Sequence, residues 1–255
     1  MENFSEVGHA KNVANFEDLI SFCSGYGATY NPSLNAIKIA NMGTLKTSAN
    51  NALTAVISAF NAYKNATNNR EIVFAPIKKL TSKIMASLKA CGAVEQTVDD
   101  ANTINYKIQG KSHAKLTKAD SGKTAAKGDE STSPPTGADD PKTISSSQQS
   151  YDSMIEHLLK LIDLLSTTAA YNPNENELKV ASLNTMLGNM RASNTAVITT
   201  YTAWSNARIV RNDLLYKKVT GLVEVAQDCK NYVKSIYGAS SGQYKQVSKL
   251  VFKKL

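Results

Sequence analysis

The residue types that carry most protein chemistry are few and scattered in this chain. The three histidines, His9, His113 and His157, stand far apart, and none has a second His or a Cys at the three- or four-residue spacing of a helical metal site. Glu156 is adjacent to His157 and therefore points elsewhere on a helix. We expect structural or solvent-exposed histidines, no metal site and no cofactor.

The cysteines give a similar result. Cys23, Cys91 and Cys229 are odd in number, widely spaced and without a CxxC partner. This pattern disfavours a disulfide framework or a zinc site and favours buried free thiols in a reducing cytoplasm.

Loops and acids that could support catalysis also have simpler interpretations. Gly25-Tyr26-Gly27 lacks the spacing of a phosphate-binding loop and is typical of a helix end. The paired acids Asp99-Asp100, Asp129-Glu130 and Asp139-Asp140 lie at an expected helix start or in a polar segment, where solvation and the helix dipole account for them. No catalytic residue is predicted, and the chain is not expected to be an enzyme.

Lysines are the remaining candidates for a binding site. The net charge is +8, and two sparse basic tracts stand out. The possible nucleic-acid contacts are Lys111, Lys115, Lys118, Lys123, Lys127, Lys245, Lys249, Lys253 and Lys254. These tracts lack interleaved arginine and aromatic residues, so solvated lysines are favoured over a dedicated nucleic-acid site.

The elements that must position these residues are written twice in the sequence. Residues 30–66 match residues 171–207 without a gap, beginning with Tyr30-Asn31-Pro32 on Tyr171-Asn172-Pro173. The match includes Thr54 to Ile57 on Thr195 to Ile198, and it keeps the apolar character of Phe60/Tyr201 and Tyr63/Trp204. This indicates an internal duplication.

Each copy predicts one long helix. An Asn cap followed by Pro at the first helical position predicts helices that begin at Pro32 and Pro173. The first should end near Asn65. The second either turns near residues 206–212, which we favour, or continues as one very long helix.

Apolar residues of the second long helix recur in alternating steps of three and four, the near-heptad pattern of a coiled coil or bundle. We predict that Leu187, Met190, Val197, Tyr201 and Trp204 are buried and that Lys179 and Arg191 face solvent.

The expected fold is all-α, with two duplicated helical-bundle units built on long antiparallel helices. Residues 1–110 form the first unit and residues 148–255 the second. Residues 111–147 are rich in Lys, Ser, Thr, Gly, Pro and Asp, have few apolar side chains to bury, and are predicted to be a disordered linker.

Several segments resemble a family of uncharacterised bacterial helical proteins with an internal duplication. The segments are Tyr171 to Glu175 with Leu178-Lys179, then Arg208, Arg211-Asn212 and Leu215-Tyr216, the ending Tyr232 to Gly238, and Lys107 to Lys111 in the first half. The resemblance implies an all-helical architecture and no known activity.

Function is therefore predicted by class only. No apolar run reaches the length of a membrane-spanning helix, and the first residues do not resemble a secretory signal. We expect a cytoplasmic, non-enzymatic structural or interaction protein that presents long helix surfaces to a protein partner or to itself. The alternative is a nonspecific nucleic-acid-binding protein that uses the basic tracts.

Overall fold

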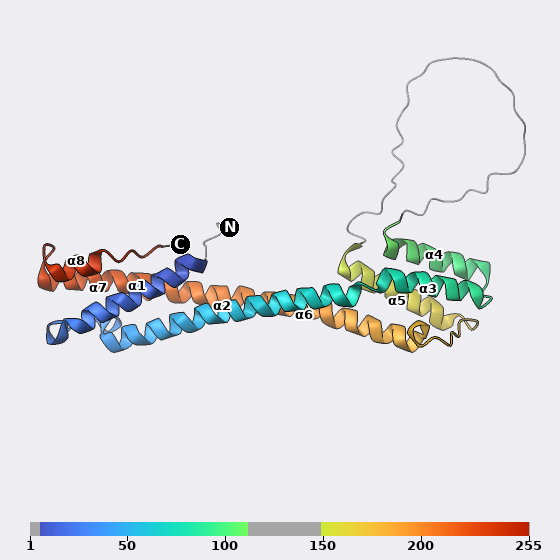
Figure 1. Cartoon of the computed structure of the whole chain (residues 1–255), viewed down its shortest axis with the longest axis horizontal. Helices are drawn as coiled ribbons and strands as arrows, with labels where there is room; N and C mark the ends of the chain where they lie inside the picture. Colours follow the sequence, from blue (N-terminus) through green and yellow to red (C-terminus); the bar gives the residue numbers. More distant parts are fainter. Residues whose placement is uncertain (1–5, 112–148, 255) are drawn as a thin grey trace, which may run out of the picture. The chain divides into compact units, whose positions relative to one another are not determined.

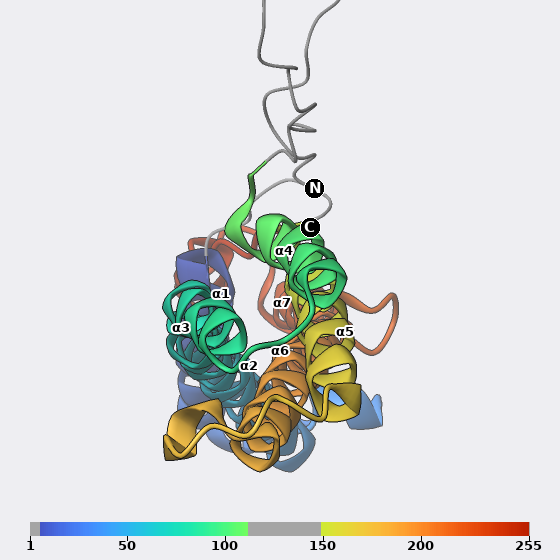
Figure 2. The ribbon, with the colours of Figure 1, turned by 90° about the vertical axis from the view of Figure 1, so that its right-hand side faces the viewer.

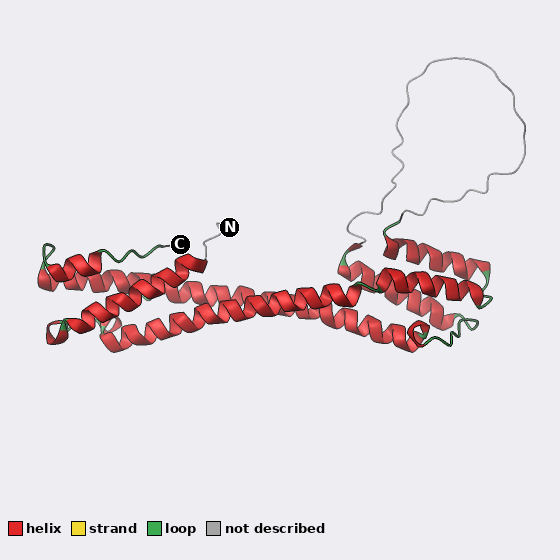
Figure 3. Ribbon diagram, viewed as in Figure 1, coloured by secondary structure: helices red, strands yellow, loops and turns green. Residues whose placement is uncertain are grey.

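The computed structural model describes residues 6–111 and 149–254, and within these ranges the chain is helical with no strand (Figure 3). The all-α prediction is confirmed. The helices are α1 (Glu6–Gly25), α2 (Ile39–Phe74), α3 (Ile77–Ala90), α4 (Glu95–Gln109), α5 (Tyr151–Thr167), α6 (Val180–Tyr216), α7 (Leu222–Tyr237) and α8 (Gly242–Ser248). Apart from Lys111, the predicted disordered linker lies outside the described residues.

The helices divide into two compact units, and each unit takes elements from both halves of the chain. The first unit holds the described residues up to Thr67 and those from Val197 onward, and the second holds the described residues of Asn68–Ala196. This division differs from the predicted one, in which 1–110 and 148–255 form separate units. The reason is the length of α2 and α6: each begins in one unit and ends in the other, so the helices before and after it belong to different units.

In the first unit, α1 packs against α7, and α8 contacts both (Figure 1). The buried residues of α1 recur in helical steps of three and four, as Phe16, Leu19 and Cys23 show. Their partners include Leu222, Val225, Cys229 and Val233 of α7, Met42 of α2, Leu215 of α6 and Val247 of α8. The ends of both long helices therefore contribute to this core.

In the second unit, α4 lies against both α3 and α5 (Figure 2). Its core takes Leu158, Leu161 and Leu165 from α5, Ile77, Ile84 and Leu88 from α3, Ile108 from α4, Phe74 from α2, and Leu183 and Leu187 from α6. Leu158, Leu161 and Leu165 repeat the spacing of Phe16, Leu19 and Cys23, and they are equally buried. Helices α1 and α5 thus contribute buried side chains with the same spacing to the cores of their units.

The predicted starts of the long helices are wrong, and the same contact explains both. The Tyr30 hydroxyl donates a hydrogen bond to the Ile37 carbonyl oxygen at 2.7 Å, and the Tyr171 hydroxyl donates to the Leu178 carbonyl oxygen at 2.9 Å. Each tyrosine is buried, so its hydroxyl needs such a partner. The segment between each tyrosine and its carbonyl partner ends in a short 3₁₀ turn, Asn35–Ile37 or Asn176–Leu178. The long helix, α2 or α6, begins two residues after this turn.

The predicted helix ends are also wrong. Helix α2 continues through Asn65, Asn68 and Asn69 to Phe74, and α6 continues through residues 206–212 to Tyr216. An asparagine inside a helix costs only some tenths of a kcal/mol, which packing along a long helix overcomes.

The turn after α6 has its own requirements. A Cβ on Gly221 would lie 2.6 Å from the Lys217 carbonyl oxygen, so the turn needs glycine there. Val219 takes a φ of 71°, a region that β-branched residues rarely occupy.

Candidate functional site

Four aromatic rings from α2 and α6 form a cluster in the first unit, which we call the aromatic surface: Phe60, Tyr63, Tyr201 and Trp204. Tyr63 and Trp204 stack, with 5.7 Å between ring centroids and 12° between ring planes. Phe60 lies 5.1 Å from Trp204, and Tyr63 lies 5.6 Å from Tyr201. Ring pairs at these separations each contribute about 0.5–1.5 kcal/mol beyond their buried area.

The ring contacts of the aromatic surface are reciprocal: each contact between two positions has a counterpart between the positions that match them in the other half of the sequence. Phe60 matches Tyr201, and Tyr63 matches Trp204. The contact of Phe60 with Trp204 is therefore the counterpart of the contact of Tyr201 with Tyr63, and the stacked pair is its own counterpart. This is the pattern of an isologous contact, in which two like surfaces meet around a two-fold axis.

Much of the aromatic surface faces solvent. Phe60 is 38% exposed and Tyr201 52%, and the neighbouring matched residues Ile57 and Ile198 are 58% and 60% exposed. Tyr201 therefore contradicts the prediction that it is buried, and Trp204 is only half-buried. The cause is that the middle of α6 is not covered by the shorter helices that enclose its ends.

The rest of the predicted burial pattern on α6 is confirmed. Leu187, Met190 and Val197 are buried, and Lys179 and Arg191 are exposed. The near-heptad register was therefore correct along the part of α6 that other helices cover.

Cations flank the aromatic surface. Lys64 lies over the Phe60 ring with its Nζ 5.7 Å from the centroid, and Arg208 lies over Trp204 at 5.2 Å. Trp, Tyr and Arg are the residue types that most often supply binding energy at protein interfaces.

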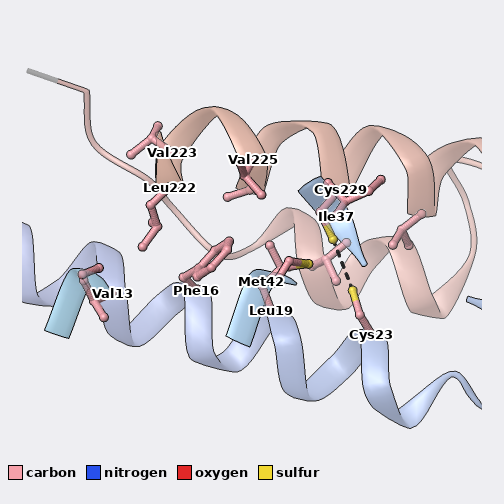
Figure 4. Close-up of a cluster of buried hydrophobic side chains, with 14 of the residues drawn as sticks. Val13, Phe16, Leu19, Cys23, Ile37, Met42, Leu222, Val223, Val225 and Cys229 are labelled. Carbon is pink, nitrogen blue, oxygen red and sulfur yellow. Dashed lines mark hydrogen bonds between the residues drawn. The ribbon is translucent and has the colours of Figure 1, made fainter. Parts of the chain in front are cut away.

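A second cluster of reactive groups lies in the core of the first unit (Figure 4). The Sγ atoms of Cys23 on α1 and Cys229 on α7 are 3.3 Å apart, and both side chains are buried. The Tyr30 hydroxyl lies 3.2 Å from the Cys229 Sγ.

Hydrogen bonding and burial shift the pKa values of these groups in different directions. The hydrogen bond to Cys229, followed by burial, raises the pKa of Cys23, and burial raises the pKa of Tyr30. The hydrogen bond with Cys23 lowers the pKa of Cys229 against the opposing effect of burial, and the contact with Tyr30 acts in the same direction as Cys23. Cys229 is therefore the more readily ionised of the two thiols.

All three cysteines are free thiols, but the sequence did not show that two of them meet. Cys23 and Cys229 are 206 residues apart, and Cys91 is half-buried in the second unit. A usable signal was present: Cys23 is the last member of the apolar stripe on α1, and Cys229 lies on the corresponding stripe of α7.

The two histidines that the structure describes, His9 and His157, are both buried in helices. His9 is buried, and its Nδ1 lies 2.6 Å from the Tyr216 hydroxyl. His157, which looked exposed in the sequence, is buried in α5. His113 lies outside the described residues. Within 6–111 and 149–254, no group of three His, Cys, Asp or Glu residues is arranged to hold a metal ion.

The predicted basic contacts are only partly placed. Lys115, Lys118, Lys123 and Lys127 lie outside the described residues, and Lys111, Lys245, Lys249, Lys253 and Lys254 are exposed.

The last lysines belong to a segment that is attached to the first unit. Asn12 donates to the Lys253 carbonyl oxygen at 2.9 Å and accepts from its N–H at 3.0 Å, and Lys254 pairs with Glu224 at 2.6 Å. Salt bridges this exposed contribute little to stability.

An open groove of about 650 Å³ lies in the second unit, between the end of α2 and the first half of α6. It is lined mainly by Ile72, Val73, Met186, Asn189 and Ser193. Its lining residues include hydroxyl and amide side chains but no acid, base or thiol.

Comparisons of the chain with protein-family models, with curated proteins and with solved structures find no match. These comparisons do not test the predicted resemblance to duplicated bacterial helical proteins, which stays a prediction. Among the described helices, none combines the length and apolar character needed to cross a membrane.

Proposed function

We propose that this chain is a non-enzymatic helical protein, built from an internal duplication as two antiparallel bundles, that associates with a second copy of itself through the aromatic surface. Matched local structure supports the duplication. The tyrosine-to-carbonyl hydrogen bond, the 3₁₀ turn and the start of the long helix each recur 141 residues later, at Tyr171, Asn176 and Val180.

The observation that carries the proposal is the exposure of large apolar side chains on the aromatic surface. Monomeric proteins rarely leave adjacent large apolar residues in water unless the patch binds something. Ile57, Ile198 and Tyr201 each keep more than half of their surface exposed, although α2 and α6 have other faces rich in Ala, Thr, Ser and Asn.

A second copy of the chain is the favoured binding partner, because the aromatic surface is itself made of two similar sets of residues. Its matched residues contact one another reciprocally within the chain. Surfaces whose matched residues lie around a local two-fold axis can pack on a copy of themselves without requiring a different partner. The flanking Lys64 and Arg208 would then stay at the polar rim.

Nucleic acid is the less favoured occupant. The exposed lysines of the final segment stand apart from the aromatic rings in sequence, and one of them is paired with Glu224. Binding through lysine and phosphate alone would be weak, independent of sequence and lost as salt rises. We further propose that the protein acts in the cytoplasm, where free thiols persist.

The molar mass of the full chain, measured by light scattering over a wide range of protein concentration, tests the proposal. We expect the mass to rise from one chain to two as concentration increases. The same series with a single-stranded oligonucleotide at physiological salt should leave this transition unchanged. A mass of one chain throughout, or an oligonucleotide complex at low protein concentration, would contradict self-association as the main function.

A further inference from the structure

The buried thiols of the first unit are more closely placed than the core requires. Cys23 and Cys229 are at most 1% exposed, and their sulfur atoms approach to 3.3 Å. A disulfide bond is about 2.05 Å long, so the two sulfur atoms need to approach by roughly another 1.3 Å. Packed helices allow side-chain adjustments of this size far more readily than backbone shifts.

The second unit shows what the same positions hold when no thiol is needed. Cys23 follows Phe16 and Leu19 on α1, and the same steps on α5 place Leu165 at its position. On α7 the buried residues Leu222, Ala226, Cys229 and Val233 recur in steps of four, three and four, and Ile77, Thr81, Ile84 and Leu88 repeat these steps on α3.

Leu165 and Ile84 thus stand at the same steps along their helices as the two cysteines. Both are core residues of the second unit. Packing alone therefore does not explain why the other unit has two thiols in contact.

We propose that Cys23 and Cys229 form a redox-active pair, which hydrogen peroxide or another small hydroperoxide converts into a disulfide that joins α1 to α7. A small, uncharged oxidant is required because both thiols are buried. Local opening of the α1–α7 packing would give such a molecule access without global unfolding.

The reaction has two steps. The Cys229 thiolate attacks a peroxide oxygen, the O–O bond breaks, and a sulfenic acid forms at Cys229 as the other oxygen leaves as water after protonation. The Cys23 thiol then attacks the Cys229 sulfur, the S–S bond forms, the S–O bond breaks, and a second water leaves. In total, two thiols lose two electrons and two protons, and one peroxide is reduced to two waters.

The position of Tyr30 supports this order of events. Its hydroxyl lies against the Cys229 sulfur at 3.2 Å and also donates to the Ile37 carbonyl oxygen. Tyr30 is therefore a positioning residue, which holds Cys229 beside Cys23 while the loop before α2 stays in place. At the matched tyrosine, Tyr171, the neighbouring polar groups are Ser87 and the single thiol of Cys91.

The bond would act on the first unit as a whole. It would close a loop that contains most of the chain, because the two residues are 206 positions apart. Crosslinks across long loops restrict the unfolded chain strongly. Trp204, the single tryptophan, lies in the same unit and reports its unfolding.

The test is oxidation of the reduced full chain with hydrogen peroxide, and in parallel with diamide, followed by alkylation and peptide mass spectrometry. We expect one disulfide-linked peptide pair, containing Cys23 and Cys229, and an unlinked Cys91. The Cys91→Ala variant should give the same product, whereas Cys23→Ala and Cys229→Ala should give no intramolecular bond. The same oxidation in denaturant should mix all three cysteines.

A thermal readout distinguishes a bond formed in the folded state from one formed by damage. Oxidation should raise the unfolding midpoint seen by Trp204 fluorescence by roughly 5–15 °C, and a thiol reductant should reverse the change. Cys229→Ala should show no shift. The proposal is wrong if Cys23 and Cys229 both remain free to be alkylated after the peroxide treatment and after the diamide treatment. It is also wrong if Cys91 is found in disulfides as often as they are.

Discussion

Tyr63 and Trp204 stand at matched positions of the two halves, and their rings stack on each other at 5.7 Å. Under the proposed duplication, a residue that contacts its own counterpart would lie on a local two-fold axis between the two halves. The aromatic surface therefore joins matched positions of the two long helices, and Phe60 and Tyr201 within it remain exposed.

Burial on α6 predicts a large difference between two apolar truncations. Leu187→Ala removes a side chain that is 3% exposed and should lower the free energy of unfolding by about 2–5 kcal/mol. Ile198→Ala is the control, since Ile198 is 60% exposed and should cost only about 0.5 kcal/mol. Denaturant unfolding followed by circular dichroism measures both. Equal effects would show that the register of α6 is wrong.

The tyrosine-to-carbonyl hydrogen bonds predict matched costs in the two units. Tyr30→Phe and Tyr171→Phe each leave a buried carbonyl group without its donor, which should destabilise the protein by about 1–3 kcal/mol. Tyr201→Phe should be nearly neutral because its ring is half exposed. Thermal unfolding of the three variants makes the comparison. If Tyr171→Phe leaves the thermal midpoint unchanged, the hydrogen bond from Tyr171 does not stabilise the protein as we expect.

The contribution of Tyr171 to stability should be measurable separately at alkaline pH. Burial raises the pKa of Tyr171 to about 12, whereas an unfolded tyrosine ionises near pH 10. Between these values the folded chain keeps a proton that the unfolded chain releases, so this contribution to stability is complete below about pH 10 and is lost as pH rises towards 12. The thermal midpoint of Tyr171→Phe should therefore fall less steeply over this range than that of the native chain. Parallel curves would contradict the assignment.

The turn after α6 offers a stabilising substitution. Val219 has a φ of 71° and is 77% exposed, so it carries backbone strain with little burial to offset it. Val219→Asn should raise stability by about 1 kcal/mol, because asparagine accepts this region more readily. Val251→Asn is the control, at an exposed valine that has no positive φ. A destabilised Val219→Asn, measured by denaturant unfolding, would show that the valine side chain contributes more than its exposure indicates.

The sequence predicted the helices well where their apolar stripes are covered. Leu187, Met190 and Val197 are buried as the spacing of three and four requires. The same spacing continues to Tyr201, yet Tyr201 is exposed. Periodicity identifies one face of a helix, but it does not say whether another element covers that face at every turn.

Contacts between distant residues account for the other errors. The Asn-Pro pairs are good local helix starts, but Tyr30 and Tyr171 bind carbonyl groups seven residues later and delay both helices. The units were assigned by halves because nothing local shows that α2 and α6 continue from one unit into the other. The thiol pair was missed for the same reason. Cys23 and Cys229 lie in different halves of the sequence and meet because both halves contribute helices to the first unit.

Self-association through the aromatic surface is tested most directly by sedimentation velocity on two matched charge variants. Tyr201→Glu places a carboxylate in the aromatic surface, and Val94→Glu places one at a similarly exposed apolar residue of the second unit. Neither should unfold the chain, because both side chains are more than half exposed. We expect the native chain and Val94→Glu to show the same concentration-dependent dimer and Tyr201→Glu to remain a single chain. If Tyr201→Glu dimerises as the native chain does, the aromatic surface is not the interface and the proposed function is wrong.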